Sequence, residues 1–359
     1  PLELCVKQHR SSRVKLMPSA NSSHQTIVPQ TMRAIALPKA SEQLHLENIE
    51  LSVPQCCDNE LLVQVEYVGL NPLDAEYAKS GFCLWQYPHI LGLDAVGIVV
   101  QAPKGVYPNI GARVMWHASM GAQGVLSEYA KVPNYAVSVV PDGANPEHAA
   151  ALPCAGMTAL ISLDKLQIVE GDTLLIEAGA GAVGQIAIQY AKQRGAEVFT
   201  TAAKCNHKLL KALGADAVFD HQDKELCEKI RRELGPQGFD AVLDSIGGDT
   251  TVRNLELMRF CGRIACLKPL PTFEQELLFR KAPNISIVSL AGAWLANSLC
   301  AQQRMSFMSK LLLESVANKE LIIPQISLVE FTANAVSAAL TKQVAGGFTG
   351  KQVVKLNPS

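Results

Sequence analysis

The apolar residues of this chain are spaced differently on the two sides of about residue 153. From Met32 onward they form short runs of strand-forming residues, and each run is followed by turn residues. The runs are 32–37, 60–70, 94–102, 111–116, 126–133 and 135–141. We expect each run to be a short strand, and the series predicts a compact, partly antiparallel, barrel-like β domain.

After residue 153 the pattern changes to alternating strand and helix candidates, beginning with a helix over 153–166. The strand candidates are 173–177, 196–201, the end of 208–221, 239–248, 261–267 and 284–292. The helix candidates between them are 185–192, the start of 208–221, 225–235 and 250–260. Six strands separated by helices predict an α/β fold with a doubly wound parallel sheet.

The final part of the chain does not continue this alternation. It contains helix candidates at 301–318 and 332–343 and a last strand candidate at 351–356. We therefore expect 292–359 to return to the first domain, 31–153, with the α/β domain, 154–291, inserted between them. Residues 1–30 lack sustained periodicity and indicate a leader or a tag-like tail. An organellar transit peptide is the alternative, because Glu3 is the single acid among several basic residues.

Composition narrows the class of protein. The 359 residues are 48% hydrophobic and 18% charged, with a net charge of -1 and no long basic run. This balance gives no support for a nucleic-acid partner. The 10 cysteines include no C-x-x-C pair, and no apolar run reaches the length of a membrane span. We expect a soluble, cytoplasmic protein with reduced thiols and no membrane partner.

The stretch from Thr173 to Lys192 carries the strongest motif, a glycine turn between a strand and a helix. The turn reads Gly179-Ala180-Gly181-Ala182-Val183-Gly184, which fits G-x-G-x-x-G. Its three glycines would permit a tight turn, a close approach to a pyrophosphate, and close packing of helix on strand. Amides at the helix start would then face phosphate groups. The pattern predicts a dinucleotide site.

The end of the second strand of this unit indicates which dinucleotide. An NAD site normally places an acid there, to bind the ribose hydroxyls. The segment from Phe199 through Thr201 to Lys204 contains no acid. Lys204, with Lys208 and His221 as weaker candidates, would attract a 2′-phosphate, which favours NADPH. The alternative is that these are ordinary surface cations.

Eight blocks in order resemble the medium-chain dehydrogenase/reductase superfamily, within it the zinc-independent quinone oxidoreductase-like branch. Besides the glycine turn they are 71–74, 92–97, 111–114, Gly124 with 127–129, 155–159, 244–247 and 350–354. The resemblance covers about 32–358. It implies a GroES-like substrate domain, an inserted Rossmann domain, and a cleft between them for nicotinamide and substrate.

The resemblance also bears on metal. Zinc enzymes of the superfamily bind the catalytic ion through a Cys, a His and a second Cys or an acid, and here these places hold Asn71, Leu93 and Cys154. One thiol cannot supply three ligands, and no cysteine lies between Val114 and Pro153 to form a structural-zinc lobe. We therefore expect no metal.

Without zinc, oxidation of an alcohol lacks a stabiliser for the alkoxide, whereas reduction of a quinone or a conjugated C=C is easier. Candidate hydrogen-bond donors are Asn71 and Tyr77, and Asp74 would orient the site. The alternative for Asn71 and Asp74 is a structural helix start with Pro72 at the first helical position. Cys154 is interpreted as a buried thiol, and His117 as a packing residue or part of the cleft mouth.

Ser245 and Gly247 follow the fourth strand, at the sheet edge where ligands bind, and the return to Lys351 would close over the nicotinamide. The expected cofactor contacts are Thr158, Gly179, Ala180, Gly181, Ala182, Val183, Gly184, Thr201, Lys204, His221, Ser245, Gly247 and Lys351.

The sequence predicts an NADPH-dependent quinone or enone oxidoreductase that acts on a small-molecule electrophile. An alcohol or aldehyde dehydrogenase and a cofactor-binding protein with little turnover are the alternatives. Relatives pair through the last Rossmann strand, so the apolar run 285–290 predicts a homodimer edge. An isolated apolar strand within a monomer would look the same.

Overall fold

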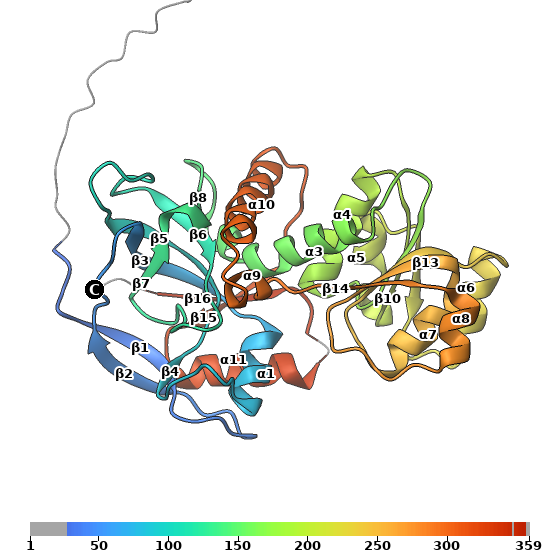
Figure 1. Ribbon diagram of the computed structural model, residues 1–359, viewed down its shortest axis with the longest axis horizontal. Coiled ribbons are helices and arrows are strands. Elements are labelled where there is room, and N and C mark those ends of the chain that lie inside the picture. The colour runs from blue at the N-terminus through green and yellow to red at the C-terminus, as the bar shows by residue number, and fades with distance from the viewer. Residues whose placement is uncertain (1–26, 347, 357–359) are drawn as a thin grey trace, which may run out of the picture.

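The computed structural model describes residues 27–346 and 348–356. The region 1–30, expected to be a leader, therefore lies almost wholly outside the described residues. Figure 1 shows two lobes, a β-rich lobe and a lobe built on a parallel sheet, with α3 and α10 between them. Among the described helices, none is both long and apolar enough to cross a lipid bilayer.

The β-rich lobe contains two sheets. The three-stranded sheet has the order β2-β1-β4, and the seven-stranded sheet has the order β15-β16-β3-β5-β6-β8 with β7 paired to β3. The strands are β1 Thr31–Leu37, β2 Glu47–Ser52, β3 Glu60–Gly69, β4 His89–Ile90, β5 Asp94–Gln101, β6 Arg113–His117, β7 Tyr129–Pro133, β8 Val137–Val139, β15 Ile326–Glu330 and β16 Lys351–Lys355. Because β16 pairs with β3, the final strand does return to the first sheet.

The second lobe is a six-stranded parallel sheet in the order β11-β10-β9-β12-β13-β14. Its strands are β9 Thr173–Ile176, β10 Glu197–Ala202, β11 Ala217–Asp220, β12 Phe239–Asp244, β13 Met258–Cys266 and β14 Asn284–Ile287. This is the expected doubly wound sheet, with the order reversing beside β9. The α/β fold class, with a GroES-like lobe and a Rossmann lobe, is confirmed.

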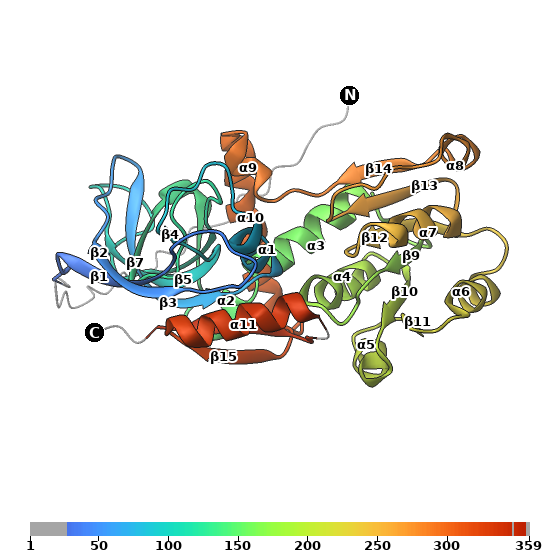
Figure 2. The same ribbon diagram turned by 90° about the horizontal axis from the view of Figure 1, so that it is seen from below.

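Helices cover the two lobes and the junction between them, and Figure 2 shows α3 at that junction with α11 along the β-rich lobe. The helices are α1 Pro72–Ser80, α2 Pro146–Ala150, α3 Pro153–Lys165, α4 Ala182–Gln193, α5 His207–Ala212, α6 Leu226–Leu234, α7 Asp249–Leu257, α8 Gln275–Lys281, α9 Gly292–Leu295, α10 Leu299–Ala317 and α11 Ala333–Ala345, with short 3-10 turns at Asn134–Ala136 and Lys204–Asn206. One apolar core joins the lobes, since it includes Val96 and Met115 of the β-rich lobe together with Leu174 and Ile186 of the other.

Several expected boundaries were wrong. The helix expected over 250–260 ends at Leu257, because Met258 is buried and pairs with Phe239 in the parallel sheet. The strand expected over 284–292 ends at Ile287, and α9 begins at Gly292. The strands β2 and β15 were not expected at all. Neither has a fully buried residue, so neither carries a strong apolar signal.

Candidate active site at the junction of the lobes

Neighbouring strands of the seven-stranded sheet end in one row at the junction. In this row Gly69 of β3 pairs with Asp94 of β5, and Asp94 pairs with His117 of β6. On the other side of β3, Gly69 pairs with Val353 of β16, two residues after Lys351. Residues far apart in the sequence therefore meet at one sheet edge.

A buried polar network forms there around Lys351. Its ammonium donates hydrogen bonds to Oδ1 of Asn71 at 2.5 Å and to Oδ2 of Asp94 at 3.2 Å. Asn71 Nδ2 donates to the same Oδ2 at 3.0 Å, and the backbone N–H of Cys154 donates to Asp94 Oδ1 at 3.0 Å. Asn71, Asp94 and Lys351 are each at most 3% exposed. The ion pair of Lys351 with Asp94 orients the Asn71 amide, whose oxygen and nitrogen both form hydrogen bonds within the network.

Helix α1 begins beside this network. Asn71 is its N-cap, Pro72 occupies the first turn, and Oδ2 of Asp74 accepts the Asn71 backbone N–H at 2.8 Å. This is the helix start foreseen as the structural alternative for these residues. Burial is the main cause that raises the pKa of Asp74 to about 7, and Asp94 adds to it. Asp74 is therefore protonated in a large fraction of molecules at neutral pH.

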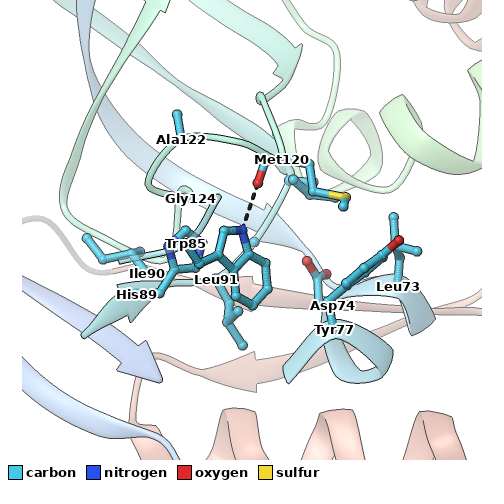
Figure 3. Close-up of a pocket in the computed structure, with 12 residues that line it drawn as sticks. Leu73, Asp74, Tyr77, Trp85, His89, Ile90, Leu91, Met120, Ala122 and Gly124 are labelled. Atoms are coloured by element: carbon cyan, nitrogen blue, oxygen red, sulfur yellow. Dashed lines mark hydrogen bonds between the residues drawn. The ribbon is translucent and has the colours of Figure 1, made fainter. Parts of the chain in front are cut away.

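A pocket opens between α1 and the loop 118–124, and Figure 3 shows Asp74 and Tyr77 on one of its sides. Most of its other walls are apolar. The lining residues are Leu73, Asp74, Tyr77, Trp85, His89, Ile90, Leu91, Gly92, Leu93, Met120, Ala122 and Gly124. The cavity is small, about 10 Å³, which is the room of a single water, so the lining side chains would have to move apart to admit an acceptor. Apolar walls with a few polar groups are the usual lining of a small-molecule site.

Aromatic side chains fix the opposite wall. The rings of Trp85 and His89 stack with centroids 4.0 Å apart, and Trp85 Nε1 donates to the carbonyl of Met120 at 2.8 Å, as Figure 3 shows. Burial lowers the pKa of His89 to about 4, so its imidazole is neutral at pH 7. His89 therefore brings no charge to the pocket.

The glycine turn lies where α4 begins, and the amides of the first turn of α4 have no side-chain cap at Gly181. A Cβ on Gly179 would lie 2.0 Å from Thr200 Oγ1, and one on Gly184 would lie 2.6 Å from the Cα of Gly179. A Cβ on Gly181 would meet one protein atom, Ala178 O, at 3.3 Å. Gly179 and Gly184 are thus required by packing. Gly181 leaves open a cradle at a helix N-terminus, and this fits a pyrophosphate.

In the part of the chain that the structure describes, β10 ends without an acid, as the sequence predicts, but Glu177 directly after the neighbouring strand β9 lies against Thr201. Thr201 is buried, and its hydroxyl donates to Glu177 Oε2 at 2.5 Å instead of facing a ligand. Glu177, the acid after β9, is also paired with Arg253. Lys204 has a side chain that is 82% exposed, with Nζ 3.8 Å from Asp220 Oδ2. His221 is exposed on the turn after β11.

The loop after β12 is held by the buried Asp244. Its Oδ1 accepts the backbone N–H groups of Ile246 and Gly247, at 2.9 and 3.0 Å, and its Oδ2 accepts the Thr251 hydroxyl at 2.5 Å. Within this loop Oγ of Ser245 is buried and has no hydrogen-bond partner in the described chain. An orphaned hydroxyl at the ligand edge of the sheet fits a contact with a dinucleotide.

Contacts between the lobes pass over this edge. Gly350 forms a parallel bridge with Gly181, and Thr349 Oγ1 lies 3.3 Å from Asn206 Oδ1. Lys268, after β13, forms an ion pair with Glu76 of α1. The return before β16 therefore crosses the glycine turn, whereas Lys351 itself lies in the buried network. Thr158 lies one turn after Cys154 on α3, at the same junction.

The sequence pointed to Asn71, Asp74 and Lys351 separately. It did not reveal Asp94, which binds Asn71 and Lys351, or the position of His117 beside it. The sequence does contain a signal that could have identified Asp94, because it is an acid at the start of an otherwise apolar strand. Asp94, His117 and Cys154 each offer a ligand atom within 4.8 Å of the other two. The expectation that Cys154 is the single possible metal ligand at this site was therefore wrong, because Asp94 and His117 lie within reach of it. The site still fits zinc poorly, because the Lys351 ammonium already lies against Asp94 and burial raises the pKa of Cys154 to about 12.

Comparisons with known proteins agree with this architecture. Residues 57–142 match the alcohol dehydrogenase GroES-like domain, and residues 182–308 match the zinc-binding dehydrogenase family. The chain belongs to the medium-chain dehydrogenase/reductase superfamily. Both matched models describe domains of dehydrogenases.

Within the superfamily, the chain is 33% identical over 198 residues to a trans-enoyl reductase from Aspergillus terreus, covering 50% of this chain and 65% of that protein. It spans only 9% to 10% of longer synthases that it also matches. The solved quinone oxidoreductase from Coxiella burnetii is 28% identical, with a TM-score of 0.78 over 91% of this chain and 100% of that one. A mycobacterial protein solved with NADPH is 27% identical, with a TM-score of 0.78 over 90% and 100%.

Proposed function

We propose that this chain is an NADPH-dependent, zinc-independent oxidoreductase that reduces quinones or α,β-unsaturated carbonyl compounds. The observation that carries the proposal is the contact of Lys351 with Asp94 and Asn71 beside the apolar pocket. The charged groups nearest the pocket neutralise one another, and no open metal position is left to stabilise an alkoxide. Reduction of an electrophilic carbon does not need one.

The choice of NADPH rests on the end of β10. The Thr201 hydroxyl donates a hydrogen bond to the Glu177 carboxylate, and the Lys204 side chain is exposed at the same end of the sheet. The glycine turn and Ser245 would hold the dinucleotide, and Lys204 would bind its 2′-phosphate. The mycobacterial relative solved with NADPH supports the same choice.

Bound NADPH supplies a hydride to the acceptor. The apolar walls of the pocket exclude water, which strengthens hydrogen bonds to the acceptor oxygen as negative charge develops there. Tyr77, on the pocket side of α1, is the side chain that donates such a bond. Asp74 holds the start of α1 and thereby positions Tyr77. The final proton comes from water or from a nearby hydroxyl.

Two acceptor classes fit this chemistry, and the relatives named as a trans-enoyl reductase and a quinone oxidoreductase support one each. The test begins with fluorescence titrations of the purified protein with NADPH and NADH, with zinc content measured on the same sample. A panel of quinones and enones then follows NADPH oxidation, before and after treatment with a chelator. We expect preference for NADPH, negligible zinc and chelator-resistant turnover.

A pair of matched variants links turnover to the pocket. Tyr77→Phe removes the donor in the pocket, and we expect kcat to fall about tenfold or more. Tyr107→Phe removes the same hydroxyl from a side chain that is 68% exposed outside the pocket, and should leave kcat unchanged. Tight NADPH binding with no turnover on any acceptor would favour the cofactor-binding protein. Turnover abolished by the chelator would favour the zinc dehydrogenase.

A further inference from the structure

The three possible metal ligands at the junction come from three elements. Asp94 starts β5, His117 ends β6, and Cys154 lies in the first turn of α3. Their ligand atoms lie within 4.8 Å of one another, and His117 Nδ1 is buried without a hydrogen-bond partner in the described chain. A carboxylate, an imidazole and a thiolate form a common donor set for a divalent transition metal.

A cation is nevertheless already present in this cluster. The Lys351 ammonium lies 3.2 Å from Asp94 Oδ2, and the two side chains are 4% and 0% exposed. Both oxygens of Asp94 are engaged, since Oδ1 accepts the N–H of Cys154 and Oδ2 accepts Lys351 and Asn71. A dication would have to displace a buried ammonium that has no solvent to move into.

We propose that Lys351 is a built-in cation that closes a latent divalent-metal site formed by Asp94, His117 and Cys154. The lysine supplies the positive charge that a metal ion would bring to this sheet edge, and it keeps Asp94 Oδ2 from coordinating. Removing that charge frees the oxygen and leaves a buried carboxylate that favours a cation. One side chain therefore separates a metal-free site from a metal-binding one.

This inference rests on the same contact of Lys351 with Asp94 that supports the proposed function, but its test needs neither an acceptor nor NADPH. The probe is Co²⁺, whose bond to a thiolate gives a charge-transfer absorption band. The full chain is titrated as wild type, Lys351→Met and Lys351→Gln. The glutamine variant keeps polar contacts with Asn71 and Asp94 while losing the charge.

We expect no thiolate–cobalt band in the wild type, and a band that saturates at one ion per chain in both neutral variants. Adding Cys154→Ser to either neutral variant should abolish the band, because the thiolate is then missing. Lys268→Met is the matched control, since it removes a lysine of the same junction that lies outside the three-ligand cluster. It should behave as the wild type does.

Thermal unfolding adds a second readout. Co²⁺ or Zn²⁺ should raise the Tm of the neutral variants and leave that of the wild type unchanged, because binding to the folded state stabilises it. A saturable band in the wild type that is lost in Cys154→Ser would overturn the proposal. So would neutral variants that fold and give no band, or neutral variants that are unfolded and not rescued by either ion. In each case the turnover assay with enones tests the proposed function independently of metal binding.

Discussion

Gly184 packs so closely on Gly179 that a Cβ at residue 184 would lie 2.6 Å from the Cα of residue 179. Gly181, between them, has φ -70° and ψ 163°, a conformation open to any residue, and its Cβ position meets only Ala178 O at 3.3 Å. The first contact is therefore a requirement of the fold. Packing does not require the open space at Gly181, and we interpret that space as room for the pyrophosphate of a bound dinucleotide.

The variants Gly184→Ala and Gly181→Ala should separate these two requirements. We expect Gly184→Ala to lower the free energy of unfolding by about 1–3 kcal/mol, because the added methyl overpacks the turn. Gly181→Ala should keep its stability within about 1 kcal/mol, since its backbone suits alanine. It should lose about tenfold or more in NADPH affinity, about 1.4 kcal/mol or more. Urea unfolding and nicotinamide fluorescence measure the two effects, and unchanged NADPH affinity in Gly181→Ala would place the pyrophosphate elsewhere.

Lys204 should determine the choice between the two cofactors. Its side chain is 82% exposed, so Lys204→Ala costs little stability. Losing a charge-assisted bond to the 2′-phosphate should weaken NADPH about tenfold and leave NADH unchanged. Lys208→Ala, four residues on, is the comparison and should have a smaller effect. Equal losses for both cofactors would show that Lys204 does not contact the 2′-phosphate.

The arrangement of elements was largely predictable, because buried parallel strands and short β runs have strong apolar patterns. The site was only partly predictable. Asn71 and Lys351 stand 280 positions apart, and their contact depends on β16 pairing with β3. The meeting of Asp94 with His117 depends on the register of β5 on β6, which apolar periodicity does not specify.

Asp74 should make stability depend on pH. Its folded pKa of about 7 lies above the ordinary value of 3.8, chiefly through burial and then through Asp94, while Lys351 and the N–H groups of Asn71 and Gly92 oppose the shift. The folded state therefore binds the proton more tightly than the unfolded state. Stability from this group is present at low pH and is lost as pH rises from about 4 to 7.

Asp74→Asn should remove that dependence. Between pH 5 and pH 8 the wild type should lose about 2–3 kcal/mol of unfolding free energy relative to the variant, as judged from urea unfolding at both pH values. Asp58→Asn, which changes an exposed carboxylate, should follow the wild type. Parallel pH profiles for the wild type and Asp74→Asn would contradict a raised pKa.

The free edge of the parallel sheet predicts the oligomeric state. In the part of the chain that the structure describes, β14 ends the sheet order, and Ile287 on it is 48% exposed. An exposed apolar edge strand favours pairing with the same strand of a second copy, which would continue the sheet across a two-fold axis. We therefore expect a homodimer, with a molar mass twice the 38.6 kDa of the chain.

Ile287→Lys should dissociate this dimer, because edge pairing would bury an unpaired ammonium on each copy. Leu328→Lys is the matched control: Leu328 is 52% exposed on β15, at the edge of the other sheet, and its replacement should leave the dimer intact. Light scattering coupled to gel filtration measures both masses. A monomeric wild type would exclude the dimer, and a dimer lost in Leu328→Lys but kept in Ile287→Lys would move the interface to β15.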